Sequence, residues 1–106
     1  MAELKYTVEK TGKDLTVIRL SGEFEGYSVL NNKDALLEHV RQNTAKNLMI
    51  DFAEIEYIDS AAVGALLEMM KQAQSQKTSF GLLHVNEDVK KVLVVTKLDK
   101  ILKIYE

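Results

Sequence analysis

Two short apolar runs, residues 48–52 and 80–85, most constrain the fold, because a helix-forming stretch follows each of them. Runs of this length without polar alternation are typical of strands that are covered on both faces. Apolar residues then recur at helical spacing over 61–75 and again over 89–96. This alternation of strand and helix favours a mostly parallel sheet covered by helices.

The first part of the chain departs from that alternation. Two extended segments, 4–9 and 15–20, flank a Thr-Gly-Lys-Asp stretch at 11–14, which predicts a hairpin. A helix is predicted over 28–42 and a last strand over 101–105. We therefore expect an α/β fold: a mostly parallel β-sheet with an opening hairpin, covered by helices.

Length and charge limit the classes of protein that need consideration. The chain has 106 residues, 46% of them hydrophobic, which suits a single domain over residues 1–106. Its formal net charge of −2 gives no broad basic footprint, so neither nucleic acid nor an anionic membrane is expected as a partner. No apolar run approaches the ~20 residues that span a bilayer, and the N-terminus lacks an apolar signal core, so a cytoplasmic location is expected.

The chain lacks the residues that several kinds of catalytic and metal site require. There is no cysteine, and two histidines, His39 and His84, are too few for a His-rich metal site. The stretch 11–13 lacks the remaining glycine and the spacing of a P-loop, and Ser60 lies outside any Gly-x-Ser-x-Gly motif. We expect no catalytic residue, cofactor or metal, and a Ser60–His84 hydrolase is the weaker alternative.

The candidate site follows the second strand of the parallel part. In such sheets, sites gather beyond the carboxyl ends of the strands, here at 21–27, 53–60 and 84–88. Asp59 and Ser60 immediately precede a helix, and both are favoured N-cap residues. Ser60 is therefore either a cap and nothing more, or a phosphoacceptor at a helix N-terminus that tolerates a phosphate.

The helix after Ser60 is predicted to have two unlike faces. Steps of 100° per residue collect large apolar side chains on one face and small or polar ones on the other. The second face is either a flat surface that another protein can approach or ordinary exposed surface, since alanine is the best helix former. The apolar face comprises Val63, Leu66, Leu67 and Met70, and the opposite face comprises Ala61, Ala65, Glu68, Gln72 and Ser75.

Charge around Ser60 indicates how a phosphate would act. Residues 47–70 contain no lysine or arginine, whereas five of them are acidic. A phosphoserine would find no basic partner nearby and would act by repulsion and desolvation at a docking surface. A loss of about 3 kcal/mol would weaken a complex more than a hundredfold.

At this point the sequence resembles a known family. Residues 48–67, with the Asp51-Phe52 strand end, the Ile58-Asp59-Ser60 turn and a helix that contains Gly64, are similar to the signature of STAS domains. Residues 20–25, Leu-Ser-Gly-Glu-Phe-Glu, are similar to the Gly-Glu-Leu-Asp stretch of that family. The likeness covers nearly the whole chain, and it implies a STAS-like fold.

The resemblance also implies a function, that of a stand-alone anti-sigma-factor antagonist. Ser60 would be phosphorylated by an anti-sigma factor that is also an ATP-dependent serine kinase, and a serine phosphatase would restore it. The unmodified form would bind the anti-sigma factor and release the sigma factor. The resemblance implies partner contacts at Glu23, Glu25, Asp59 and Ser60. The outer face of the predicted helix adds Ala61, Ala65 and Glu68 to the expected partner-binding residues.

Two departures and one alternative stay open. Ala61-Ala62 stands where many members have Ser-Gly, and Glu25 replaces the commoner Asp. Residues alone also allow Glu23 and Glu25 to be solvated charges. The alternative is a STAS subunit that binds a partner constitutively, in a transport or signalling complex, with Ser60 acting only as a cap.

Overall fold

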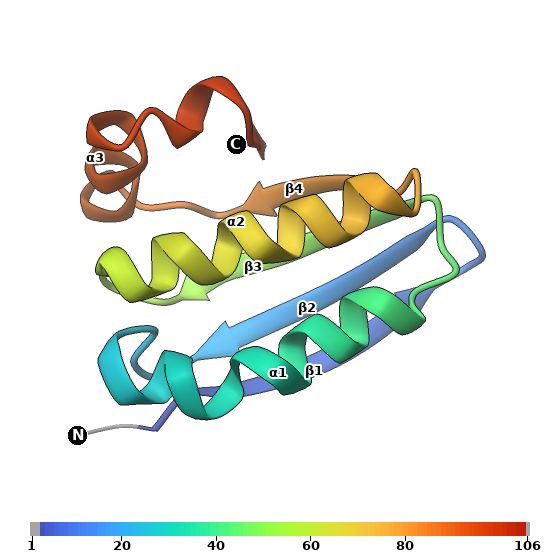
Figure 1. The fold of residues 1–106 in the computed structure, drawn as a ribbon, viewed down its shortest axis with the longest axis horizontal. Coiled ribbons are helices and arrows are strands. Elements are labelled where there is room, and N and C mark those ends of the chain that lie inside the picture. The colour runs from blue at the N-terminus through green and yellow to red at the C-terminus, as the bar shows by residue number, and fades with distance from the viewer. Residues whose placement is uncertain (1–2, 106) are drawn as a thin grey trace.

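The computed structural model describes residues 3–105 and contains one five-stranded sheet with helices packed against it (Figure 1). The strands are β1 (Lys5–Thr11), β2 (Leu15–Ser21), β3 (Asn47–Glu54), β4 (Ser79–Leu83) and β5 (Lys103–Tyr105). The helices are α1 (Gly26–Gln42), α2 (Ser60–Ser75), α3 (Glu87–Val95) and a short 3₁₀ turn, η1 (Leu98–Lys100).

The order of strands in the sheet is the order of strands along the chain, β1-β2-β3-β4-β5. The pair β1–β2 is antiparallel, and every later pair is parallel. Right-handed crossovers that all step in one direction place consecutive helices on the same face of a sheet. Figure 1 shows α1 and α2 side by side in front of the same sheet face, as that rule requires.

The core lies between this face and the helices. Alternate strand residues point toward α1 and α2 and are fully buried, among them Ile18, Leu20, Ile50 and Phe52. On the other face, Val17 and Met49 are 6% and 7% exposed. Tyr105 closes part of that face, because a Cβ built on Gly81 would lie 2.6 Å from the Tyr105 ring and 3.0 Å from the Met49 sulfur. The absence of a side chain at position 81 thus lets an aromatic ring lie directly on the sheet.

The predicted fold class is confirmed: a mostly parallel sheet after an opening hairpin. The run 48–52 is buried throughout, as expected. However, α1 and α2 cover only one of its faces, and side chains such as Arg19 and Tyr105 cover the other. Helix α1 begins at residue 26, two residues before the predicted start, because the side chain of Asp59 supplies a hydrogen-bond acceptor to the N–H of Gly26. None of the helices formed by residues 3–105 has the length and hydrophobicity that crossing a bilayer requires.

Candidate functional site

Two loops meet at the carboxyl end of the strands and hold the candidate site. Phe24 and Ile58 form an isolated parallel bridge between the loop after β2 and the loop after β3. Both side chains are fully buried, and the Phe24 ring packs edge-on against Phe52 with the centroids 6.0 Å apart. Phe24 therefore anchors the first loop, and Ile58 together with the buried Ile55 anchors the second, while the neighbouring glutamates stay partly or fully exposed.

Asp59 joins the two loops and begins α2. Its Oδ1 accepts a hydrogen bond from the N–H of Ala62 at 3.1 Å, which makes it the N-cap. Its Oδ2 accepts from the N–H of Gly26 at 2.9 Å, at the start of α1. One carboxylate thus fixes the starts of two helices relative to each other.

Ser60 is the first residue of α2, and it is exposed. Its hydroxyl makes no hydrogen bond with any residue that the structure describes. Of the two roles left open for Ser60, that of an N-cap is wrong, because Asp59 is the cap and Ser60 lies one position inside the helix. The described contacts of the fold thus make no use of the Ser60 hydroxyl.

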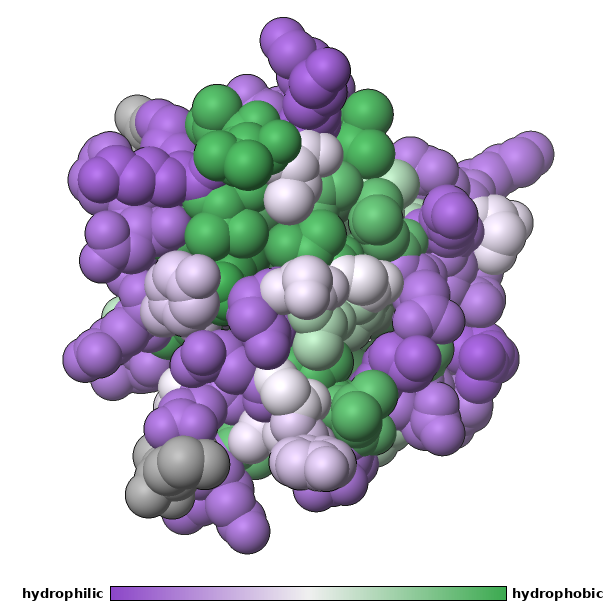
Figure 2. Space-filling view, turned by 60° about the vertical axis from the view of Figure 1, so that its left-hand side comes forward, coloured by the Kyte–Doolittle hydropathy of each residue, from purple (hydrophilic) through white to green (hydrophobic). Residues whose placement is uncertain are grey.

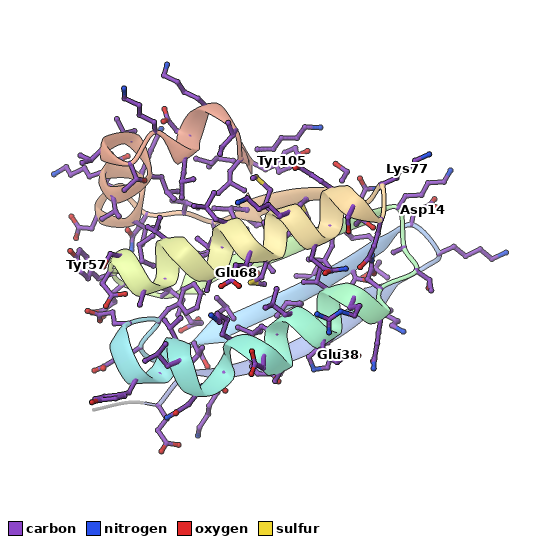
Figure 3. All side chains as sticks on the ribbon, in the orientation of Figure 1. Asp14, Glu38, Tyr57, Glu68, Lys77 and Tyr105 are labelled. Atoms are coloured by element: carbon purple, nitrogen blue, oxygen red, sulfur yellow. The ribbon has the colours of Figure 1, made fainter. Side chains whose placement is uncertain are left out.

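Four carboxylates surround a depression beside this helix start. It has a volume of 330 Å³ and lies at the end of the molecule where Figure 3 labels Tyr57. Among the described residues that line it, no side chain is basic. The lining residues are Gly22, Glu23, Glu25, Glu54, Glu56 and Tyr57.

Large, mainly apolar side chains are exposed at the same end of the molecule as the acidic depression, and Tyr57 is one of its lining residues. Tyr27 is 82% exposed and Leu30 is 61% exposed, both in the first turns of α1, and Tyr57 is also exposed. Figure 2 turns this end of the molecule forward and shows further apolar side chains gathered in its upper half, at the level of α3. Exposed aromatic side chains are enriched at protein-binding faces, and charged side chains there lie chiefly on the rim.

The exposed part of α2 is narrower than its sequence predicted. Ala61 is partly exposed, and a Cβ built on Gly64 would meet nothing within 4 Å, so the helix surface there is open. Ala65, which was expected on the outer face, is 1% exposed. The prediction that it contacts a partner is wrong, because α2 packs against α1 on that side as well as against the sheet.

Glu68 lies two turns beyond Ser60 along α2. Its carboxylate forms an ion pair with Lys33 of α1 at 3.0 Å. It lines a separate depression with Leu37 and Gln72 rather than the acidic one. Glu68 is therefore placed as a link between the two helices.

A second polar cluster lies on the sheet face that α1 and α2 do not cover. Asp51 is 4% exposed; its Oδ1 accepts from His84 Nδ1 at 2.8 Å, and its Oδ2 accepts from Arg19 Nε at 3.2 Å. Burial alone would raise the pKa of Asp51, but the hydrogen bonds from His84 and the Ala53 N–H, assisted by Arg19, hold that pKa below its ordinary value. His84 adopts a left-handed backbone, with φ of 58°.

This cluster does not extend to Ser60. A bond between His84 Nδ1 and Asp51 is what a hydrolase triad would contain, but neither ring nitrogen of His84 bonds the Ser60 hydroxyl. The structure thus does not assemble a Ser60–His84 pair. Among residues 3–105 there is also no group of three or more His, Cys, Asp or Glu side chains placed to hold a metal ion.

Sequence reasoning singled out Ser60, Glu23 and Glu25 as candidates but missed the exposed Tyr27 and Tyr57 and the bond between Asp59 and Gly26. Exposure of Tyr27 and Tyr57 depends on how two loops pack, which no local pattern reveals. One signal was available: Phe24 stands between two glutamates, and Ile55 and Ile58 stand among acidic residues in the second loop. Such residues anchor loops to a core and so indicate which flanking residues face outward.

Comparison with known proteins places the chain in a family. The STAS domain model matches residues 5–106. A curated relative from Thermotoga neapolitana, named as a candidate anti-sigma factor antagonist, is 36% identical over 59 residues, 56% of this chain and 52% of that protein. The match thus spans about half the length of that relative.

Solved structures support the fold over nearly the whole chain. The anti-sigma factor antagonist SpoIIAA in its unphosphorylated form has a TM-score of 0.78 at 22% identity, covering 96% of this chain and 89% of that one. The phosphorylated form of the Bacillus cell fate determinant SpoIIAA has a TM-score of 0.71 at 20% identity, covering 96% and 92%. At these identities the likeness establishes the architecture alone.

Proposed function

Because this chain belongs to the STAS domain family, we propose that it is a single-domain anti-sigma-factor antagonist controlled by phosphorylation of Ser60. The unmodified form binds an anti-sigma factor with serine kinase activity in the cytoplasm and so releases the sigma factor. Phosphorylation ends that binding, and a serine phosphatase restores it. The observation that carries the proposal is the exposed Ser60 hydroxyl, which has no structural bond because Asp59 caps the helix.

The surroundings of Ser60 suit a partner with a basic surface. Glu23 and Glu25 lie beside Glu54 and Glu56 around one depression, so a cationic side chain of the partner would find several carboxylates at once. Tyr27 and Tyr57 add apolar area that water covers only until a partner docks. Ala61 and Gly64 leave room for a close approach to α2.

A phosphate on Ser60 would disturb association without disturbing the fold. Free N–H groups in the first turn of α2 and the helix dipole tolerate a negative charge there. Asp59 already carries a carboxylate at the neighbouring position, and its hydrogen bonds are directed inward. The phosphate therefore adds bulk at the start of α2, and on docking it must lose the water around its charge of about −1.5 to −2, which weakens association.

The direct test is phosphorylation by the cognate anti-sigma factor with ATP, followed by intact-mass measurement. The wild-type chain should gain one phosphate, and Ser60→Ala should gain none. Ser75→Ala is the matched control, since Ser75 is an exposed serine at the other end of α2 whose hydroxyl donates to the Gln72 carbonyl at 2.7 Å. It should be phosphorylated as the wild type is.

Binding is then measured by calorimetry on the separated forms. Ser60→Ala should bind the anti-sigma factor like the unmodified wild type, and Ser60→Asp should fold normally and bind at least tenfold more weakly. Equal affinity of the phosphorylated and unmodified chains would reject the switch. A chain that binds tightly but is never phosphorylated would instead be a constitutive STAS subunit.

A further inference from the structure

A second depression lies at the opposite end of α2 from Ser60. It has a volume of 390 Å³ and is bounded by the last two turns of α2, the start of β4 and the start of β5. Ser60 and Gln74 are separated by about 20 Å along the helix axis. Figure 3 labels Lys77 at this end and Tyr57 at the other, so the depression does not belong to the site described above.

The floor of the depression is apolar. Met70 and Phe80 are 7% and 6% exposed and face it from α2 and β4. Ile101, at the end of η1, is 54% exposed and forms one apolar wall. The space accommodates about a dozen non-hydrogen atoms if each takes ~30 Å³, as in liquid water.

Hydrogen-bond donors face the same space. Thr78 is 7% exposed as a residue, and its hydroxyl makes no hydrogen bond with any residue between 3 and 105. Since none of the fully buried side-chain oxygens or nitrogens among these residues lacks a partner, the Thr78 oxygen keeps access to solvent and is free to donate to a ligand atom. The side chains of Gln74 and Ser79 also line the space and are likewise without side-chain bonds in the described part of the chain.

The charge of the rim has one sign. Lys77 and Lys103 stand on two sides of the depression, and neither forms an ion pair with a described residue. No acidic side chain is among the described residues that line it. The backbone that carries Lys77 is fixed, since the Thr78 N–H donates to the Ala73 carbonyl at 2.9 Å and the Ser79 N–H donates to the Lys46 carbonyl at 2.8 Å.

We propose that this depression binds a small organic anion with an apolar tail, such as a medium-chain carboxylate. The tail lies on Met70 and Phe80, and the head group accepts hydrogen bonds from Thr78 and the two ammonium groups. A neutral apolar molecule would contact only the floor of the depression, and a small anion without a tail would contact only the hydrogen-bond donors and lysines. This inference is independent of Ser60 and of the proposed antagonist function.

The test adds octanoate, as the probe, to the full ¹⁵N-labelled chain. Binding is measured from the changes in the amide chemical shifts. Octanoate should shift the amides of residues 74–80 and 101–103 saturably. Octanol and acetate, which supply the tail and the head separately, should each bind at least tenfold more weakly. Equal binding of octanol, saturable shifts centred on another surface, or no saturation by octanoate would overturn the proposal.

Variants then separate charge from the apolar floor. Lys77→Gln with Lys103→Gln should weaken octanoate binding about fivefold and leave octanol binding unchanged. Lys13→Gln with Lys46→Gln removes the same charge away from the lining and should have less than a twofold effect. Thr78→Val keeps the volume of the side chain and should weaken octanoate binding about threefold. Ser60→Asp should bind octanoate as the wild type does, whatever the outcome of the kinase experiment. If the two lysine pairs have equal effects, the rim does not define a site.

Discussion

At the scale of single residues, Asp59 and Ser60 divide two tasks that both residue types perform well. Either side chain can cap a helix, so the sequence predicts a cap at this turn without deciding which residue provides it. The structure gives the cap to Asp59, because its second oxygen also bonds the N–H of Gly26. A serine has a single side-chain oxygen, so it is less suited to accept hydrogen bonds from both the Ala62 N–H and the Gly26 N–H. Ser60 is left with an exposed hydroxyl that the fold does not use.

Asp51 permits a prediction about acid stability. Its pKa is held below the ordinary value of 3.8 by hydrogen bonds from His84 and the Ala53 N–H, against the opposing effect of burial. The folded state therefore binds this proton less readily than the unfolded state, so the network stabilises the fold fully above the ordinary pKa. That contribution is lost as the pH falls through the lowered pKa.

Asp51→Asn should accordingly lower the free energy of unfolding by about 2 kcal/mol at pH 7, since the hydrogen bonds lost involve charged groups. The difference from wild type should shrink as the pH falls below 4. Urea denaturation at a series of pH values measures both quantities. Asp34→Asn, on the exposed part of α1, is the control and should follow the wild-type curve. A difference that stays constant down to acid pH would show that packing, not the carboxylate charge, is what Asp51 supplies.

At the scale of elements, the order of strands and helices follows from hydrophobic patterning, but the faces of α2 do not. Ala61 and Ala65 occupy the same predicted stripe, yet only Ala61 reaches the surface. Alanine carries almost no polarity signal, so its burial is decided by whether a second helix packs there. The position of α1 beside α2 depends on the sheet order, which no local window contains.

The end of α3 offers a prediction about backbone strain. Lys97 follows the C-cap Thr96, has φ of 63°, and donates its N–H to the Val94 carbonyl at 3.0 Å. Glycine adopts this left-handed conformation with little steric cost, whereas lysine does not. Lys97→Gly should raise the free energy of unfolding by about 0.5–1 kcal/mol, as measured by urea denaturation.

The control for this prediction is a lysine in ordinary backbone. Lys91→Gly, inside α3, should destabilise the chain by about 1 kcal/mol, because glycine in a helix interior loses conformational entropy on folding. If both glycine variants destabilise the protein, the left-handed conformation at Lys97 carries no strain worth relieving.

At the scale of the whole molecule, the small net charge hides an uneven placement of charge. At the Ser60 end, Glu54 and Glu56 lie beside Glu23 and Glu25 around one depression, whereas Lys13, Lys46 and Lys77 lie at the other end together with Asp14. Figure 3 shows Lys77 and Tyr57 at opposite ends of the long axis. The near balance of 14 basic and 16 acidic residues therefore says little about the field that an approaching partner meets.

The glutamates gathered near Ser60 yield a kinetic prediction for the proposed anti-sigma partner. Carboxylates on the rim of a docking surface chiefly steer the encounter, so removing them changes the association rate more than the dissociation rate. Glu54→Gln with Glu56→Gln should slow association about three- to tenfold at low salt and leave dissociation within twofold, in stopped-flow or surface-plasmon measurements. The difference should fade above about 0.5 M salt, where charges are screened within a few ångströms.

Asp34→Asn with Glu38→Gln removes two charges from the later part of α1 and should change neither rate by more than twofold. If that control slows association as much as the Glu54/Glu56 variant does, total charge rather than the placement of charge around Ser60 governs the encounter.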